Sequence, residues 1–201
     1  MSRLSGEGIV YSAIDVKKWA AEIPSAESAR PACCSRCGAA SRPLGGALAL
    51  EGHGLRERQV RGPSEPLGAP ETRTIRVRRY RCRLCGGLTT VLPRGLTARR
   101  HYSASAIGLS VCLYGMLRLS IGETRQRVCT WRVSFEPSRW TTLPRWVTAI
   151  SQGRLFPFVR GCPSTFSLRE RAERAGATLC GMALSSGSPE SQAFFGAALS
   201  A

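Results

Sequence analysis

The sequence predicts a small α+β protein in which a three-stranded sheet is followed by a helical bundle and a helical tail. Three observations predict this order. A Cys-x-x-Cys-Gly motif occurs twice, at residues 34–38 and 82–86. Next to the second motif, apolar and basic residues alternate with the two-residue period of β-strands. Beyond residue 102 the apolar residues recur at helical spacing, and two Ser-x-x-Glu capping boxes mark helix starts.

The two cysteine motifs predict a metal site. Each Cys-x-x-Cys pair can reach one ion from a tight turn, and the glycine that follows lets the backbone turn over the sulfurs. Together the motifs offer the four thiolates of a closed tetrahedral Zn²⁺ site, which leaves no coordination position for catalysis. Cys33 competes with Cys34 as a ligand, but only Cys34 gives both motifs the same spacing. The predicted zinc ligands are therefore Cys34, Cys37, Cys82 and Cys85.

The segment between the motifs is about twice as long as in the usual zinc ribbon. This costs little, because loop-closure entropy grows only logarithmically with length. The Pro/Gly-rich residues 62–70 are expected to form a loop that takes up the excess. The competing interpretation is four unrelated buried thiols, and the repeated spacing argues against it.

The cysteines also bear on location. Nine cysteines without a secretory signal favour a reducing, cytoplasmic environment. The longest apolar stretch, residues 104–117, is shorter than the roughly 20 residues that a membrane-spanning helix needs. We therefore expect neither a membrane nor a small-molecule partner.

The charge of the chain is strongly positive and unevenly distributed. There are 29 basic and 13 acidic residues, a net charge of +16, and Lys17 and Lys18 are the only lysines. Residues 52–160 contain twenty arginines against five glutamates, so nearly all of the excess is central. Because arginine makes forked contacts with phosphates and guanine edges, we expect a nucleic-acid partner and association with the nucleoid. A genome-wide arginine bias would not by itself deplete acidic residues from one segment.

Residues 1–30 are expected to form an arm, with a short strand at Ile9–Tyr11 and a helix that ends before Pro24. Ser12 or Asp15 is the predicted cap of that helix. The ribbon is placed at residues 31–93, with strands at 54–61, 72–81 and 88–92. So small a sheet buries little surface, and metal binding would contribute directly to its folding free energy.

The middle strand is predicted to present one basic side to an anion. Successive residues of this strand alternate between its two sides. Arg76, Arg78 and Tyr80 lie on one side. Ile75 and Val77 lie on the other, and Arg79 and Arg81 continue that apolar side. Arg81 and Arg83 flank Cys82, where they would either contact phosphate or offset the negative charge of a tetrathiolate zinc centre.

Residues 99–152 are predicted to form three helices. Ser103 caps the first, whose apolar stripe runs from Ile107 through Val111 and Tyr114 to 116–117. The second begins at Ile121 behind a capping box, and the third covers 142–150 with Thr142 as its cap. The order resembles a helix-turn-helix with a basic third helix. A plain three-helix packing unit is the alternative, and the long connection through 131–137 makes the match a loose one.

The tail, residues 153–201, has two further helix starts, at the Ser167 capping box and at Ser188-Pro189. Two alternatives stay open for it. Either the tail docks on the preceding helices or it pairs with a second chain.

Several of these motifs together carry a family resemblance. They are the two cysteine knuckles, His53-Gly-Leu-Arg56, the basic approach Arg78–Arg81, Thr89-x-Val-Leu-Pro93 and Arg99-Arg-x-Tyr-Ser103. The region from 31 to 152 resembles the N-terminal zinc ribbon and helix-turn-helix of bacterial insertion-sequence transposases, and bacterial proteins that keep only that half. The resemblance implies that the four cysteines hold zinc and that the helices recognise the end of an element or an operator.

The chain departs from that family in its carboxylates. A DDE-type transposase needs three of them to hold two Mg²⁺ ions. Beyond Tyr102 this chain has no aspartate, and its five glutamates lie in the basic segment or on the tail helices. We therefore expect no enzymatic activity.

The sequence thus predicts a zinc-dependent protein that binds double-stranded DNA sequence-specifically. It is expected to be related to transposases but without a catalytic domain, and to act as a regulator or transposition accessory. A second copy and a full-length transposase are further candidate partners. The alternatives are an RNA-binding ribbon protein, a subunit or inhibitor of a full-length transposase, and an inactive remnant. The predicted nucleic-acid contacts are Arg76, Arg78, Arg79, Arg81, Arg83, Arg94, Arg99, Arg100, Arg125, Arg127, Arg139, Arg145 and Thr148.

Overall fold

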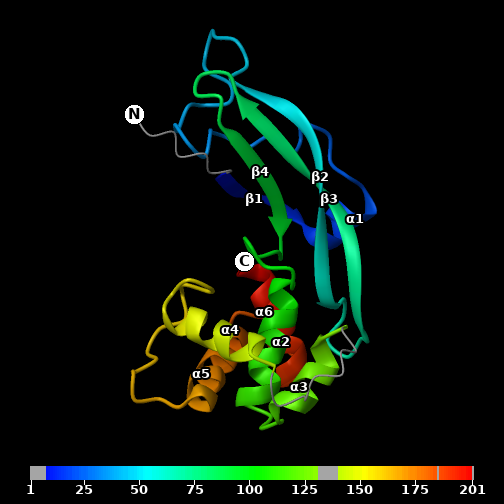
Figure 1. The fold of residues 1–201 in the computed structure, drawn as a ribbon, viewed down its shortest axis with the longest axis vertical. Coiled ribbons are helices and arrows are strands. Elements are labelled where there is room, and N and C mark those ends of the chain that lie inside the picture. The colour runs from blue at the N-terminus through cyan, green and yellow to red at the C-terminus, as the bar shows by residue number, and fades with distance from the viewer. Residues whose placement is uncertain (1–7, 131–139, 185, 201) are drawn as a thin grey trace. The chain divides into compact units, whose positions relative to one another are not determined.

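The computed structural model describes residues 8–130, 140–184 and 186–200 (Figure 1). The described part is a small α+β structure with a four-stranded mixed sheet and six helices. It divides into two compact units, one within residues 1–58 and 74–94 and the other within 59–73 and 95–201. We call these the sheet unit and the helical unit.

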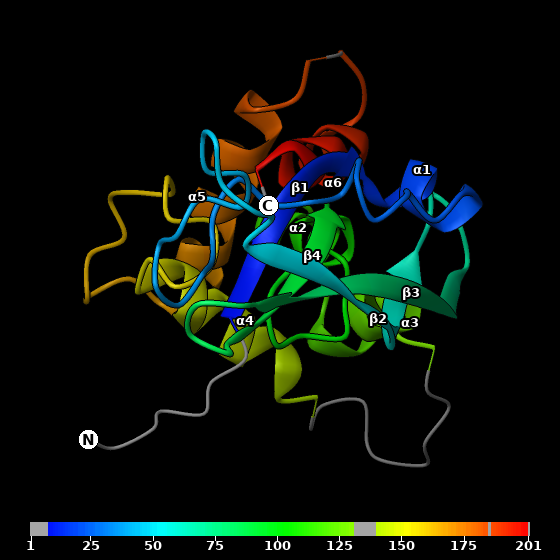
Figure 2. The same ribbon diagram turned by 90° about the horizontal axis from the view of Figure 1, so that it is seen from above.

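The sheet contains one strand more than the sequence predicted. Its members are β1 (Gly8–Asp15), β2 (Leu50–Pro63), β3 (Pro70–Cys82) and β4 (Leu88–Arg94), in the order β1-β4-β3-β2. β3 and β4 are antiparallel, whereas β1 adds parallel to β4 (Figures 1 and 2). The three-stranded ribbon is thus corrected to four strands, because the N-terminal arm contributes an edge strand of eight residues. The distal part of the β2–β3 hairpin, residues 59–73, belongs to the helical unit.

The register of the sheet assigns its residues to two faces. Val91 lies opposite Val10 on β1 and Arg78 on β3, while Thr90 lies opposite Ile9 and Arg79. Directly opposed residues share a face, and successive residues alternate between faces. We call one face the arm face, with Val10, Arg76, Arg78, Tyr80, Cys82 and Val91. We call the other the arginine face, with Ile9, Tyr11, Val77, Arg79, Arg81, Thr90, Leu92 and Arg94.

The arm face is covered by the segment that follows β1. Helix α1 (Val16–Ala21) begins after Asp15, whose carboxylate accepts a hydrogen bond from the Lys17 N–H at 2.8 Å, so Asp15 is the cap and Ser12 is not. The α1 side chain of Trp19 is fully buried, and its indole N–H donates to the Arg76 carbonyl at 2.9 Å. The sequence predicted a packing arm here, and the structure places its tryptophan in the core of the sheet unit.

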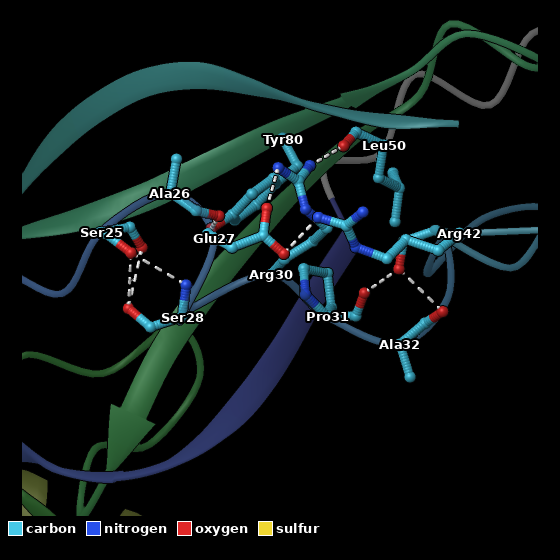
Figure 3. A network of polar contacts seen from close by, with 11 residues as sticks. Ser25, Ala26, Glu27, Ser28, Arg30, Pro31, Ala32, Arg42, Leu50 and Tyr80 are labelled. Carbon is cyan, nitrogen blue, oxygen red and sulfur yellow. Dashed lines mark hydrogen bonds and ion pairs between the residues drawn. The ribbon is translucent and has the colours of Figure 1, made fainter. Parts of the chain in front are cut away.

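A polar network fixes the loop after α1 to the same face (Figure 3). The Tyr80 hydroxyl donates to the Ala26 carbonyl at 2.8 Å. Glu27 accepts from both Arg30 and Arg42, and these two guanidinium groups lower its pKa. Arg30 also lies over the Tyr80 ring, 5.6 Å from its centroid. Arm and sheet therefore fold as one unit, where the sequence suggested an arm and a separate ribbon.

The helical unit has α2 (Ala104–Gly115) at its centre. Around it lie α3 (Ile121–Val128), α4 (Thr142–Ser151), α5 (Leu168–Gly181) and α6 (Pro189–Leu199), as Figure 1 shows. Every residue of α2 is buried, so the predicted one-sided stripe is wrong, and the helix is surrounded on all sides. Its many small residues make this possible. Helices α5 and α6, from the predicted tail, pack on α2 as part of the bundle.

Glycines set how closely these helices approach. A Cβ on Gly115 would lie 2.2 Å from the Glu173 backbone nitrogen of α5. One on Gly196 of α6 would lie 1.9 Å from the Leu179 carbonyl oxygen. Both positions therefore exclude any larger residue unless the helices move apart.

The predicted helix starts are largely confirmed. Ser103 caps α2, and complete capping boxes open α3 at Ser120 and α5 at Ser167. The cap of α4 is Thr141, one residue before the predicted Thr142, and its side chain makes no capping hydrogen bond. None of the helices in the described ranges is long and apolar enough to cross a membrane.

Candidate metal centre

The four predicted cysteines come together at one end of the sheet unit. Their Sγ atoms all lie within 4.8 Å of one another. Cys34 and Cys85 are 3.8 Å apart, as are Cys37 and Cys82. A disulfide needs sulfurs about 2.05 Å apart, so none of the four cysteines forms a disulfide. Sulfurs at the corners of a tetrahedron, about 2.3 Å from a central Zn²⁺, would lie about 3.8 Å apart.

The two knuckles, residues 34–38 and 82–86, have the same backbone hydrogen bonds. In each, the glycine N–H donates to the carbonyl of the first cysteine at 2.9 Å. Gly38 and Gly86 have φ values of 71° and 66°, which favour glycine. The first cysteine N–H donates to the residue five positions later, Ala39 or Gly87, at 2.8 and 2.9 Å. The repeated sequence motif is thus also a repeated local structure.

Backbone N–H groups point at the sulfurs. The Arg36 N–H approaches Cys34 Sγ at 3.4 Å, and the Gly87 N–H approaches Cys85 Sγ at the same distance. Burial would raise the pKa of Cys34, but the N–H groups of Cys37 and Arg36 outweigh it and lower the pKa to about 7. Such donors stabilise thiolates, which are the form that binds metal.

Four thiolates would nevertheless repel one another without a cation. The Ala39 N–H lowers the pKa of Cys37, but the sulfurs of Cys85, Cys34 and Cys82 have the opposite effect and raise it to about 12. A second thiolate beside an existing one is therefore unfavourable. A divalent cation at the centre would remove this penalty, and the cluster could hold a metal ion such as zinc.

The sheet and the core position the knuckles. Cys82 is the last residue of β3, and both it and Cys34 belong to the buried cluster around Trp19. Ser35 lies 2.8 Å from the Thr89 hydroxyl on β4, which ties the first knuckle to the sheet. Cys33 is exposed and lies outside the sulfur cluster, as its spacing predicted.

The predicted nucleic-acid arginines that the structure describes fall into two groups. Those in the first group are used within the protein. Arg78 Nε donates to the Pro24 carbonyl at 2.8 Å, Arg83 pairs with Glu51, and Arg127 lies 4.0 Å from Glu190. Arg100 and Arg125 also have partners.

The second group makes no hydrogen bond or ion pair with the described residues. Its members are Arg76, Arg79, Arg81, Arg94, Arg99 and Arg145. Arg76 is exposed on the arm face, and Arg79, Arg81 and Arg94 lie on the arginine face. The basic side that the sequence predicted, with Arg78 and Tyr80, is largely covered by the arm, and three of the six arginines without a partner lie on the opposite side of the sheet.

The helical candidates are only partly described. Arg145 is exposed on α4 and Thr148 is half-buried there, whereas Arg139 lies outside the described residues. Arg99 has a positive φ of 59° in the loop before α2. Sequence reasoning did not select Tyr11, which is 48% exposed on the arginine face. Its position depends on β1 pairing with β4, and no local signal in the sequence encodes that pairing.

Comparisons with protein-family models, with curated proteins and with solved structures gave no match.

Proposed function

We propose that this protein binds double-stranded DNA and that Zn²⁺, held by the four clustered cysteines, keeps its sheet unit folded. The observation that supports the metal is the cluster of four sulfurs, two pairs of which are 3.8 Å apart. When bound, the ion would supply structural stabilisation, because four protein ligands leave no position for a substrate.

The uneven charge supports nucleic acid as the partner. Six of the predicted arginines have no partner among the described residues, and a folded surface with unpaired arginines attracts phosphates. In this proposal Arg76 and Arg99 contact phosphates, while Arg145 and Thr148 of α4 contact base edges in the major groove. Arg78 and Arg100 are left out of this set because each already has a partner within the protein.

The resemblance to the recognition half of insertion-sequence transposases supports a role as a regulator or transposition accessory of the nucleoid. The chain lacks the carboxylates of a DDE site, so we propose that it does not catalyse strand transfer. The alternative of a transposase subunit that acts through its tail loses its main support, because α5 and α6 pack against α2 and their removal would expose a buried helix.

A selection experiment tests the proposal. Zinc-loaded protein is used to enrich duplexes from a random-sequence library, and affinities are then measured at several salt concentrations. We expect an enriched motif and an affinity that falls steeply with salt. Arg145→Ala should reduce the preference for the enriched duplex over a scrambled one by about 5- to 150-fold, which corresponds to one lost base contact. Arg76→Ala should weaken binding to both duplexes equally.

Two outcomes would contradict it. Equal losses on both duplexes for both variants would remove the assigned division between phosphate and base contacts. Tighter binding to structured RNA than to any enriched duplex would favour the RNA-binding alternative.

A further inference from the structure

The two faces of the sheet differ in what their polar side chains contact. On the arm face, Arg78 and Tyr80 donate to the Pro24 and Ala26 carbonyls, each at 2.8 Å. On the arginine face, three guanidinium groups of β3 and β4 have no hydrogen bond or ion pair with the described residues, whereas Arg73 near the start of β3 is paired with Glu71. These groups are Arg79, Arg81 and Arg94. The arginine face therefore carries three cations that the described structure does not neutralise.

Two of these three arginines are partly buried against the sheet. The Nε atoms of Arg79 and Arg94 are buried and have no hydrogen-bond acceptor within the described ranges. On the same face Val77 and Leu92 are 1% and 0% exposed. Arginine stems commonly cover apolar neighbours while the guanidinium stays near the surface. Turning either guanidinium outward onto a phosphate would therefore gain a hydrogen bond without breaking one.

An aromatic ring lies on the same face. Tyr11 of β1 is opposite Leu92 of β4, and its side chain is 48% exposed. It lies two strands from Arg79, at a lateral distance of about 10 Å for strands about 4.8 Å apart. Arginine and tyrosine side chains that extend from these positions can contact neighbouring parts of one bound molecule.

We infer that the arginine face binds a segment of single-stranded DNA, whose phosphates contact Arg79, Arg81 and Arg94 and one of whose bases stacks on Tyr11. The inference rests on the proposed function only in taking DNA as the partner. It adds a second surface, on the sheet unit, to the duplex contacts proposed for α4.

The positive charge and the exposed tyrosine ring together indicate which molecule this face binds. The three cations require a polyanion, and the exposed ring offers a stacking surface that a base can use only when it is unpaired. Duplex DNA presents phosphates but keeps its base faces inside the stack. Contacts to phosphates and base faces need no ribose 2′-hydroxyl, so DNA suffices as the strand.

The test uses the zinc-loaded full chain and a fluorescently labelled short oligo(dT), with binding followed by anisotropy. Tyr11→Leu should weaken binding by about 5- to 100-fold, as the loss of one stacked base does, and Tyr11→Phe should bind like the wild type. Arg81→Gln should weaken binding and reduce the slope of log affinity against log salt by about 0.7. Arg73→Gln is the matched control, since Arg73 is also exposed on β3 but is paired with Glu71.

Each outcome decides. Tyr11→Leu and Arg81→Gln variants that bind oligo(dT) as tightly as Arg73→Gln would overturn the inference, provided that the Trp19 indole signal shows both folded. If only Arg81→Gln weakened oligo(dT) binding, base stacking on Tyr11 would be refuted, and with it the assignment to single-stranded DNA. Tighter binding of oligo(U) than of oligo(dT) would overturn the assignment to DNA. In any of these cases duplex selection through Arg145 would still stand, so the two proposals fail separately.

Discussion

The sheet unit and the helical unit bury their side chains by different means. The core cluster of the sheet unit has seven buried residues, and two of them, Cys34 and Cys82, belong to the sulfur cluster. The helical unit instead has a fully buried α2, against which α5 and α6 pack through glycines and alanines. A core as small as the first rarely stabilises a fold alone, whereas the second resembles an ordinary helix bundle. We therefore expect the stability of the sheet unit, and not that of the helical unit, to depend on metal.

The largest expected effect comes from removing one sulfur. Cys82→Ser should abolish stoichiometric zinc and unfold the sheet unit, because structural zinc contributes on the order of 10 kcal/mol of folding free energy. The helical unit should keep its helical circular dichroism. Cys33→Ser is the matched control, since this exposed cysteine adjoins a ligand but lies outside the cluster. Zinc content that is equal in the two variants would contradict the assignment.

A substitution in the helical unit tests whether its stability depends on close helix packing and not on metal. In Gly196→Ala the new Cβ would lie 1.9 Å from the Leu179 carbonyl oxygen, so α6 must move away from α5. We expect a loss of about 1–3 kcal/mol or more in the unfolding of this unit, with zinc binding unchanged. The control is Gly181→Ala, where the added Cβ meets nothing within 4 Å and α5 should gain a few tenths of a kcal/mol. Chemical denaturation followed by circular dichroism measures both, and equal stabilities would refute the close approach.

A smaller effect is expected at the start of α3. Ser120→Ala removes the side chain that accepts from the Glu123 N–H at 3.2 Å, and with it one half of the capping box. The helical unit should lose about 1 kcal/mol. Ser12→Ala on β1 should change the stability of this unit by nothing measurable, since Ser12 belongs to the sheet unit. A larger loss in Ser12→Ala than in Ser120→Ala would show that the units do not unfold separately.

Local signals predicted the local structure well. The knuckles and the caps at Ser103, Ser120 and Ser167 follow from short motifs whose hydrogen bonds are made within a few residues. The gathering of the four cysteines was predicted on other grounds, because two Cys-x-x-Cys pairs together complete one tetrahedral metal site. Helix α4 was placed correctly, but its cap was assigned one residue late. Caps and tight turns are predictable because their geometry depends on few neighbours.

Long-range pairing was not predictable in the same way. Nothing near Ile9 specifies that β1 pairs with β4, eighty residues away along the chain. Without that pairing, the alternation in β3 shows which arginines share a side, but not which side the arm covers. The burial of α2 was missed for a related reason, since the helices that enclose it come from residues 168–199. The tertiary structure thus determines which arginines have no partner within the described protein, so the sequence alone could not identify them.

The measurement that tests the metal-dependent sheet most directly is chelation followed by the indole N–H signals of the full chain. Trp19 reports on the sheet unit through its hydrogen bond to the Arg76 carbonyl, and Trp146 reports on the helical unit. We predict one bound zinc per chain, loss of the Trp19 signal when a strong chelator removes it, persistence of the Trp146 signal, and recovery of Trp19 when zinc is added back. A purified protein without zinc whose Trp19 signal is unchanged by the chelator would contradict the account.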